Sequence, residues 1–456
     1  MKLVINNKED IIKYIKSNNI NFIDFRFCDL IGNWNSFTMF AKNFSEEMFT
    51  IGHSIDGSSI IGFEHIEYSD MYIVPDPYTV YIDNTNLQYG SVSLVMICDV
   101  YNIDGTRYSR DSRNIARKAE KCLSDIGIGD TFFVGPELEF FVFDKANFND
   151  KEYNVEYNNY PYNIESKKGY FIPTPNDKLY NFRKEVMFEL EQCGIETEIS
   201  HHEVSPNQCE IDIKYDSLLK MADKVMIFKH IVKNVSSIFN NVVTFMPKPI
   251  YGENGNGMHV HQSLWKNNNN LFYDPDSKNM LSQNALYFIG GLIKHASSLC
   301  AFGNSTTNSY KRLVPGYEAP VNLSYSFNNR SAAIRIPFSF NLNVSRRLEF
   351  RCPDPMSNPY LLFSALLMAG IDGIINKINP GEPKNFNLYE NNSNVKNTPL
   401  SLEESLDCLS KDYEYLVRGN VFTKDVIDTF IKIKTEECKE VSTRPHPHEF
   451  NLYFSK

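Results

Sequence analysis

The stretch VGPELEFFVFD, residues 134–144, has the apolar content of a buried strand, with valine, leucine and phenylalanine through most of its length. Glu137 and Glu139 lie two residues apart within it, so both carboxylates project from the same face of the strand. Ionised carboxylates are costly to remove from water. Either this face is solvated, which is the commonest arrangement for such a pair in an antiparallel strand, or a counter-charge lies opposite it.

Three further segments combine a strand pattern with charged or imidazole side chains. They are HHEVSPNQCEIDIKY at 201–215, NGNGMHVHQSL at 254–264 and RRLEFRCPD at 346–354. The first contains two glutamates on either side of an expected turn, and the other two place their polar residues at alternate positions, on one face. The residues concerned are Glu203, Glu210, His259, His261, Arg347, Glu349 and Arg351.

Each segment alone has a plain structural explanation, because histidines are more often structural than metal-binding and Arg347, Glu349 and Arg351 could form an exposed charge ladder. Their co-occurrence favours a shared counter-ion. Carboxylates with imidazoles and no thiolate favour Mg²⁺ or Mn²⁺ over a structural zinc. Interleaved arginines suit phosphoryl transfer. The sequence has no G-x-x-x-x-G-K-[ST] motif, so nucleotide phosphates would be held by metals and arginines and not by a P-loop.

Length and composition exclude several classes of protein. The chain has 456 residues, a net charge of −10 and 42% hydrophobic residues, which gives no encouragement for nucleic acid or an anionic membrane as a partner. The start MKLVINNKED lacks an apolar signal core, and the apolar run 360–370 is too short to span a bilayer. Nine cysteines without a C-x-x-C pair fit a reducing compartment. We therefore expect a soluble, cytoplasmic protein.

The pattern along the chain predicts two domains, residues 1–105 and 106–456. Residues 111–127 have helical spacing of apolar residues, with Asp111 or Ser112 as the N-cap and glycine past the end. Residues 358–378 are expected to form a buried helix that proline opens. The asparagine-rich segments, at 146–163, 267–270 and 385–397, are expected to be surface loops.

Taken together, the motifs closely resemble type I glutamine synthetase and follow the order of that family over nearly the whole chain. NSYKRLVPGYEAP at 308–320 is a very specific signature. The other matching segments are DGSS (56–59), SDMYIVPD (69–76), GPELEFF (135–141), GYFIP (169–173), HHEV (201–204), VTFMPKP (243–249), NGNGMHVHQSL (254–264), NRSAAIRIP (329–337), RRLEFRCPDP (346–355) and RPHPHEF (444–450).

The resemblance implies an α+β fold, with a small N-terminal β-grasp-like domain and a larger catalytic domain. The antiparallel sheet of the latter would form part of an intersubunit barrel. It also implies active sites between subunits of a hexameric ring and a dodecamer of two stacked rings. Two or more Mg²⁺ or Mn²⁺ ions per subunit are implied. The expected ligands are Glu139, Glu203 and Glu210 for one ion, and Glu137, His259 and Glu349 for the other.

The reaction that the resemblance implies is ATP-dependent ligation of ammonia to the γ-carboxylate of glutamate, through γ-glutamyl phosphate. The matching positions divide by expected role as follows: Asp56, Glu318, Arg330 and Arg351 in catalysis; Glu198, Tyr215, His261, Ser263, Arg335 and Arg347 on ATP; Asn254, Gly255 and Arg312 on glutamate; Asp56, Ser59, Tyr170 and Glu203 on ammonium. Asp56 would come from the adjacent subunit, and Glu318 would lie on a flap that closes over the intermediate.

Some positions depart from the family pattern, and none of them removes an expected metal ligand. Asn256 and Ser305 replace a usual serine and a common proline, and Asn207 replaces a usual glycine, which asparagine can do because it tolerates a positive φ. Val344 stands where the adenylylated subtype tends to carry lysine, so the chain is closer to the alpha subtype.

Regulation is less clearly indicated than chemistry. His65 replaces an arginine linked to feedback inhibition in alpha enzymes. Tyr389 resembles the adenylylated tyrosine in its local context, although an ordinary loop tyrosine is an equal alternative. A regulatory protein partner is therefore compatible with the sequence.

Three rival functions are compatible with parts of the sequence. A γ-glutamyl ligase for a larger amine would need a changed ammonium pocket, whereas Asp56 and Glu318 are both present. A non-catalytic structural or regulatory relative would be free to lose its metal ligands, whereas all six expected ligands are retained. A plain two-metal hydrolase would need neither a flap nor the arginine cluster.

Overall fold

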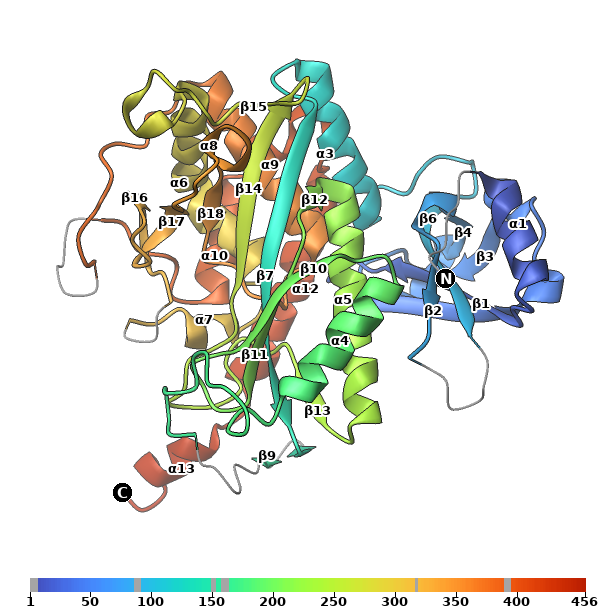
Figure 1. The fold of residues 1–456 in the computed structure, drawn as a ribbon, viewed down its shortest axis with the longest axis horizontal. Coiled ribbons are helices and arrows are strands. Elements are labelled where there is room, and N and C mark those ends of the chain that lie inside the picture. The colour runs from blue at the N-terminus through green and yellow to red at the C-terminus, as the bar shows by residue number, and fades with distance from the viewer. Residues whose placement is uncertain (1–6, 86–91, 149–152, 157–163, 316–318, 389–394) are drawn as a thin grey trace.

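The computed structural model describes residues 7–85, 92–148, 153–156, 164–315, 319–388 and 395–456. Within these residues the chain forms a smaller N-terminal part on a six-stranded sheet and a larger part on a ten-stranded sheet (Figure 1). The larger part carries most of the helices. The α+β class expected from the sequence is confirmed.

The N-terminal sheet runs in the order β2-β1-β6-β4-β3, with β5 on β6. Its central strand β6 is buried along most of its length, and α1 packs its buried isoleucines, Ile11 and Ile15, into the same apolar cluster. The β1–β6 pair is parallel, and the others are antiparallel. The elements are α1 (Lys8–Ser17), β1 (Phe22–Cys28), β2 (Trp34–Phe40), η1 (Ala41–Asn43), α2 (Met48–Ile51), β3 (His53–Asp56), η2 (Gly57–Ser59), η3 (Ile66–Tyr68), β4 (Asp70–Pro75), η4 (Pro77–Thr79), β5 (Tyr81–Asp83) and β6 (Ser93–Asn102).

The larger sheet is centred on β7, the long strand that contains residues 134–143, and runs in the order β10-β11-β7-β14-β18-β17-β16. Among the described residues its pairs are antiparallel, as expected, except for the parallel pair β16–β17. Its strands are β7 (Thr131–Phe143), β10 (Thr197–His202), β11 (Gln208–Ile213), β12 (Asp216–Ser217), β13 (Val242–Thr244), β14 (Met258–Lys266), β15 (Asn269–Asn270), β16 (Asn322–Phe327), β17 (Ala332–Ile336) and β18 (Leu348–Phe350).

Helices cover the apolar face of this sheet, as Figure 1 shows for α3 and α5 beside β7. The helices of the larger part are α3 (Ser112–Ile126), α4 (Tyr180–Gln192), α5 (Leu218–Ile238), η6 (Lys278–Met280), α6 (Gln283–Gly303), α7 (Ser309–Arg312), α8 (Leu342–Ser345), α9 (Pro359–Ile375), α10 (Leu402–Lys411), α11 (Glu414–Val417), η7 (Arg418–Asn420), α12 (Lys424–Ser442) and α13 (Pro447–Tyr453). Helix α3 has the predicted ends, because Asp111 caps its N-terminus and Gly127 adopts the left-handed conformation.

The central helix pair of the core is α6 and α9. Pro359 opens α9 behind the N-cap Asn358, as predicted, and the helix is buried nearly throughout. Glycines permit the close approach of the two helices, since a Cβ on Gly291 would lie 2.1 Å from the carbonyl oxygen of Ala369. Helix α6 is long and apolar enough to cross a membrane by length and composition, but 78% of its most apolar window is buried inside the protein, as in a core helix.

The prediction of loops in the asparagine-rich segments was wrong in part. β8 (Lys145–Phe148) and β9 (Tyr153–Glu156) pair as an antiparallel hairpin in the first half of the first of these segments, and β15 occupies 269–270. Asparagine is uncommon in strands, but backbone pairing between adjacent chain segments outweighs that weak preference. The last segment, 385–397, is described only in part.

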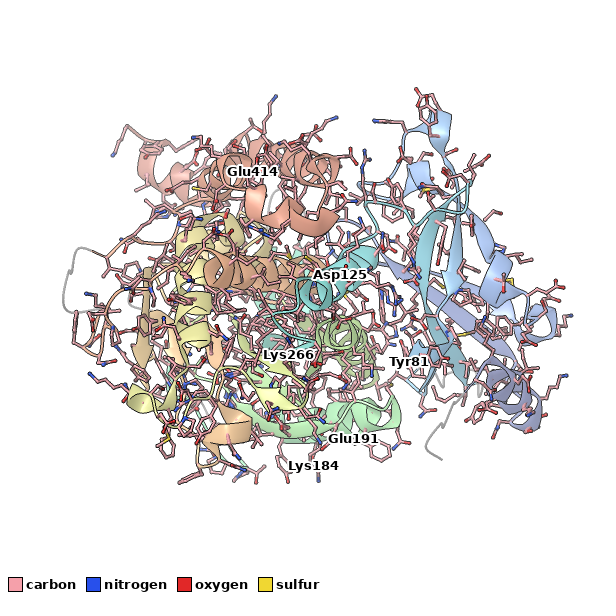
Figure 2. All side chains as sticks on the ribbon, turned by 90° about the horizontal axis from the view of Figure 1, so that it is seen from above. Tyr81, Asp125, Lys184, Glu191, Lys266 and Glu414 are labelled. Atoms are coloured by element: carbon pink, nitrogen blue, oxygen red, sulfur yellow. The ribbon has the colours of Figure 1, made fainter. Side chains whose placement is uncertain are left out.

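The N-terminal part joins the larger part through buried ion pairs (Figure 2, which labels Tyr81 near the junction). Arg113 on α3 donates to Asp76 at 2.9 Å and to Asp223 on α5 at 3.0 Å, and it also pairs with Asp99 on β6. The hydroxyl of Tyr360 on α9 donates to Asp223 at 2.7 Å. These residues are called the interdomain cluster below.

Candidate active site

The register of the larger sheet aligns the polar residues that the sequence analysis singled out. Glu210 on β11 lies opposite Glu139 on β7, and the next such row joins Asp212, Glu137 and His259 across three strands. A further row places His261 of β14 opposite Glu349 of β18. Because residues two apart share a face, all of these side chains lie on one side of the sheet.

The other face of the same strands explains why the site is rigid. Leu138, Phe140 and Val142 alternate with the site residues on β7 and are fully buried in the core. A shift of one residue in register would place the carboxylates in that core, so the packing of the apolar residues determines where the carboxylates point.

A cavity of about 560 Å³ lies over this polar face. It brings together most of the residues predicted to hold metals and glutamate, although these residues come from segments far apart in the sequence. The predicted site residues among its lining are Glu137, Glu139, Tyr170, Glu203, Glu210, Asn254, Gly255, His259, Arg312, Arg330 and Arg351.

A second cavity, of about 340 Å³, adjoins the first, and Glu137 and Asp212 line both. Aromatic residues form one wall, where the ring of Phe133 packs edge-on against Tyr215 and Trp265. The predicted ATP residues that line this second cavity are Glu198, Tyr215, His261, Ser263 and Arg347.

Several carboxyl groups of the first cavity have raised pKa values, because burial and neighbouring carboxylates both disfavour their charged form. Burial, followed by the charge of Glu203, raises the pKa of Glu139 to about 8. Burial and the charge of Glu137 raise the pKa of Asp212 to about 7. Burial and the charge of Glu139 hold the pKa of Glu210 well above its usual range. A bound cation would relieve this repulsion.

Glu137 and Glu349 behave differently because cationic or hydrogen-bonding groups surround them. Burial acts to raise the pKa of Glu137, but the charge of His261 and hydrogen bonds with His259 and His261 outweigh it and hold that pKa well below the usual range. The Nδ1 of His259 and the Nε2 of His261 lie 3.0 Å and 2.7 Å from the two oxygens of Glu137. Burial also acts to raise the pKa of Glu349. The charge of Arg351, which pairs with Glu349, outweighs burial, and the pKa falls to about 2.

The donor atoms fit divalent cations in two places. In one, Glu137, His261 and Glu349 each offer an atom within 4.8 Å of the others. In the other, the same holds for His201, Glu203 and Glu210. Asp212 adds a buried oxygen, Oδ1, which has no hydrogen-bond partner within the described part of the chain. Oxygen and imidazole donors without thiolates are those expected for Mg²⁺ or Mn²⁺.

These two groups resemble the predicted ligand sets but are not identical to them. His259 also lies near the first group, with Nδ1 3.0 Å from Glu137 and 3.8 Å from Glu349. Glu139 lines the same cavity but lies outside the second group, where His201 takes a place. The predicted assignment of each ligand to an ion therefore stays a prediction.

The segments predicted to contact glutamate lie at the edge of the first cavity. Arg312, which ends α7, is buried and donates to the carbonyl oxygens of Cys352 and Arg351 at 2.7 Å and 3.2 Å. Burial lowers its pKa. Gly255 lies so close to Pro247 that a Cβ would be 2.2 Å from that carbonyl oxygen, which explains why glycine is needed there.

The arginines predicted to bind phosphate oxygens lie on β17, at the two ends of β18 and in the turn before β17. Arg335 and Arg351 both pair with Glu349, and Arg330 lines the first cavity. Arg347 donates to the Nδ1 of His261 at 3.1 Å and so links the arginines to the second cavity.

Two predicted residues are not assembled with the rest in the described chain, and two others lie outside it. Asp56 and Ser59 lie on the N-terminal part, where the Asp56 carboxylate accepts hydrogen bonds from the hydroxyls of Ser58 and Ser59 at 2.6 Å and 2.8 Å. These bonds lower the pKa of Asp56. Neither residue lines either cavity. Glu318 and Tyr389 lie outside the described residues.

Sequence reasoning missed several residues of the site. The sequence pattern assigns no metal to the HH pair at 201–202, whereas His201 lies with two metal-ligand candidates. Asp212 continues the alternation that begins at Glu210, so its position on the charged face could have been found from the strand pattern. Gln208, Trp265 and Val344 carried no distinct local signal for a place in the cavities. Only the pairing of distant strands reveals them.

Comparison with known proteins is consistent over the whole chain. Residues 19–103 match the family model of the glutamine synthetase β-grasp domain, and residues 109–453 match that of the glutamine synthetase catalytic domain. The glutamine synthetase of Streptomyces filamentosus is 48% identical to this chain, over 98% of this chain and 99% of the relative. That of Frankia alni is 46% identical, over 98% of each chain.

Solved structures agree with the sequence comparisons. The cryo-EM structure of Plasmodium falciparum glutamine synthetase is similar with a TM-score of 0.90 and 33% sequence identity, over 99% of this chain and 100% of that one. The chain therefore belongs to the glutamine synthetase family.

Proposed function

We propose that this protein catalyses the ATP-dependent ligation of ammonia to the γ-carboxylate of L-glutamate, through γ-glutamyl phosphate, to give glutamine, ADP and phosphate. One observation carries the proposal beyond family membership. The cavity with the predicted ATP residues adjoins the cavity with the predicted glutamate residues, and Glu137 and Asp212 line both. A phosphoryl group could pass directly between two substrates bound in this way.

Two or more divalent ions per subunit, Mg²⁺ or Mn²⁺, would be held by the predicted ligands, which are Glu137, Glu139, Glu203, Glu210, His259 and Glu349, with His201, Asp212 and His261 beside them. When bound, such ions neutralise phosphate oxygens. Arg330 and Arg351 would contact the transferring phosphoryl group, because both line the first cavity. Arg351 also pairs with Glu349. Arg335 and Arg347 would contact the other phosphates of ATP, beside Glu198, Tyr215, His261 and Ser263.

The glutamate substrate would lie against Asn254, Gly255 and Arg312. The buried guanidinium of Arg312 is the natural partner for a carboxylate of the substrate, because its position is held by two backbone carbonyls. Gly255 would let the backbone approach the substrate closely.

Ammonium would bind at the open side of the first cavity, between Tyr170 and Glu203 of one subunit and Asp56 and Ser59 of the next. The exposed carboxylate of Asp56 is kept ionised by its serine partners, which suits the capture and deprotonation of an ammonium ion. Glu318 would close the site as a flap that excludes water.

The remaining expectations belong to the same proposal. The division into residues 1–105 and 106–456, the dodecamer of two hexameric rings with intersubunit sites, the intersubunit barrel and the cytoplasmic location are all inferred from the family. The alpha subtype, a regulatory protein partner and modification of Tyr389 are also proposals. They rest on the local motifs and on the lack of lysine at Val344.

The test is phosphate release by the purified protein with ATP, Mg²⁺, glutamate and ammonium, omitting each component in turn. We expect release to require all four and glutamine to form. Asp56→Ala should lower kcat/KM for ammonium on the order of 100-fold, because it removes the group that accepts a proton. Asp104→Ala is the matched control, since Asp104 is also an exposed aspartate whose carboxylate accepts from a hydroxyl, that of Thr106, in the same part of the chain.

Other outcomes would redirect the proposal. Phosphate release with putrescine or ethanolamine but not with ammonium would indicate a γ-glutamyl ligase for a larger amine. Release from ATP without glutamate would indicate a hydrolase. No turnover with any amine, in a folded protein that binds Mn²⁺, would indicate a non-catalytic member of the family.

A further inference from the structure

Gln208 is a fully buried amide at the start of β11, between the metal-ligand candidates Glu203 and Glu210. Its Nε2 lies 3.0 Å from the Oε2 of Glu139, 3.1 Å from the carbonyl oxygen of Gly255 and 3.1 Å from the Oδ1 of Asn256. One side chain therefore contacts both a candidate metal ligand and the segment predicted to bind glutamate.

The contact with Glu139 decides which of its oxygens can accept further partners. Oε2 accepts from the amide of Gln208 and, at 2.9 Å, from the backbone N–H of Gly257. Within the described part of the chain, Oε1 accepts no hydrogen bond. Two donors on one oxygen restrict rotation of the carboxylate and leave Oε1 as the atom that can hold a cation.

The other contacts of Gln208 fix the loop that contains residues 254–257. Asn256 is itself held on its far side, because its side-chain amide donates to the carbonyl oxygen of Met246 at 2.9 Å and its backbone N–H donates to Pro247 at 2.8 Å. Ser205, in the same turn as Gln208, donates its hydroxyl to the carbonyl oxygen of Asn254 at 3.2 Å. The turn between β10 and β11 thus holds the loop at two points.

We propose that Gln208 is a positioning residue that couples the cation-binding carboxylate Glu139 to the glutamate-binding loop at 254–257. The coupling rests on the proposed function only for the identity of the substrate. A buried glutamine that merely satisfies its hydrogen bonds would support the fold without affecting either ligand. Here the three acceptors belong to the two ligand sites themselves. Loss of the amide should therefore weaken the binding of both the cation and glutamate.

The variant that tests this is Gln208→Met, which preserves volume and removes the donor. The first measurement is binding of Mn²⁺ alone to the purified protein, without ATP, by calorimetry or by electron paramagnetic resonance. We expect the affinity of at least one site to fall about 10-fold or more. In turnover, KM for glutamate should rise by a similar factor, while KM for ATP should change less than about two-fold.

Two variants in the same turn separate the two halves of the coupling. Ser205→Ala removes the tie to Asn254 without touching Glu139, so it should raise KM for glutamate and leave Mn²⁺ affinity unchanged. Asn207→Gly is the matched control, because glycine accepts the positive φ of 62° at this position and Asn207 contacts neither ligand site. It should alter neither quantity.

The proposal fails if Gln208→Met keeps the Mn²⁺ affinity and the KM for glutamate of the parent protein, or if KM for ATP rises as much as KM for glutamate. If Gln208→Met does not fold, Gln208→Asn takes its place, because the shorter amide cannot reach Glu139. The Mn²⁺ measurement needs no turnover. A parent protein without glutamate-dependent activity would therefore overturn the proposed function while the effect of Gln208 on Glu139 is still measured.

Discussion

Two buried groups of acidic residues lie in this protein, and their surroundings differ. In the interdomain cluster, Asp76, Asp99 and Asp223 surround Arg113. In the candidate active site, Glu139, Glu203, Glu210 and Asp212 line one cavity and repel one another. In the first group the charge of arginines outweighs the effect of burial on the pKa of Asp99, and in the second group burial and neighbouring acids prevail at Glu139, Glu210 and Asp212.

The pKa values express this difference. Burial acts to raise the pKa of Asp99, but Arg113, Arg117 and Arg107 outweigh it and lower it to about 2. Burial and a neighbouring carboxylate instead raise the pKa of Glu139 to about 8. Asp111 is an exception beside the interdomain cluster, with a pKa raised to about 7 by burial and Asp99, but its oxygens accept the backbone N–H groups of Val100 and Arg113.

The pKa values of buried acids therefore distinguish a structural ion cluster from a cation site. Buried acids whose charge is offset by arginines stabilise one arrangement of the protein's parts, whereas buried acids whose pKa values are raised by neighbouring acids favour a cation from outside. The two groups should therefore respond to mutation with opposite signs of stability change, and that difference can be measured.

The largest expected effect is on Arg113. Arg113→Met would leave the buried Asp99 and Asp223 without the guanidinium that they share with Asp76, and should lower the free energy of unfolding by about 3–5 kcal/mol. Denaturant unfolding measures this. Lys121→Met is the control on the same helix, because Lys121 pairs with Asp125 at the surface and its loss should cost less than about 0.5 kcal/mol. Equal losses for the two variants would contradict the contrast.

The second prediction concerns Glu139. Glu139→Gln should lower ligase activity on the order of 100-fold or more, because it removes an oxygen that holds a cation near the transferred phosphoryl group. In excess chelator, the free energy of unfolding should be unchanged or higher, because the substitution removes an acid from a repulsive group. A clear loss of stability without metal would place Glu139 with the structural acids.

The third prediction concerns the pH dependence of stability without metal, which is small per pH unit. Glu139 has a folded-state pKa of about 8, above its usual 4.5, so the folded protein binds more protons between these values and its stability falls as pH rises. We expect a decline on the order of 1 kcal/mol per pH unit between about pH 5 and pH 8. Chemical unfolding at several pH values, with and without saturating Mg²⁺, measures it.

The interdomain cluster should act in the opposite pH range. Asp99 has a pKa lowered from 3.8 to about 2, so its contribution is present above pH 4 and is lost as pH falls towards 2. Arg113→Met should flatten the acid side of the stability profile and leave its decline between pH 5 and pH 8 unchanged. If Mg²⁺ leaves that decline unchanged as well, the carboxylates of the cavity are not its cause.

Much of the fold and of the candidate site was predictable from local pattern. The ends of α3 follow from Asp111 and Gly127, and α9 follows from Asn358 and Pro359, because caps and breakers act within a few residues. The charged faces of β7, β11 and β14 follow from alternation alone. The family, and with it the expected roles of most site residues, follows from the order of the motifs.

Other features could not be predicted in this way, because they depend on contacts between distant segments. The hairpin of β8 and β9 arose where asparagine content indicated a loop. His201 lies with Glu203 and Glu210 through the β10–β11 pairing, and Gln208 reaches Glu139 and residues 254–257 only because β7, β11 and β14 pack side by side. A local pattern contains no information about such neighbours.

By itself, the sequence determined which residues could carry the chemistry, because residue type and a spacing of two set both the donor atoms and the strand face they share. The tertiary structure decided which of these residues meet. It paired Glu210 with Glu139 and His261 with Glu349, joined the two cavities at Glu137, and placed Arg113 among three aspartates. The physical reason is that charges interact over a few ångströms in space, and distance along the chain does not determine that separation.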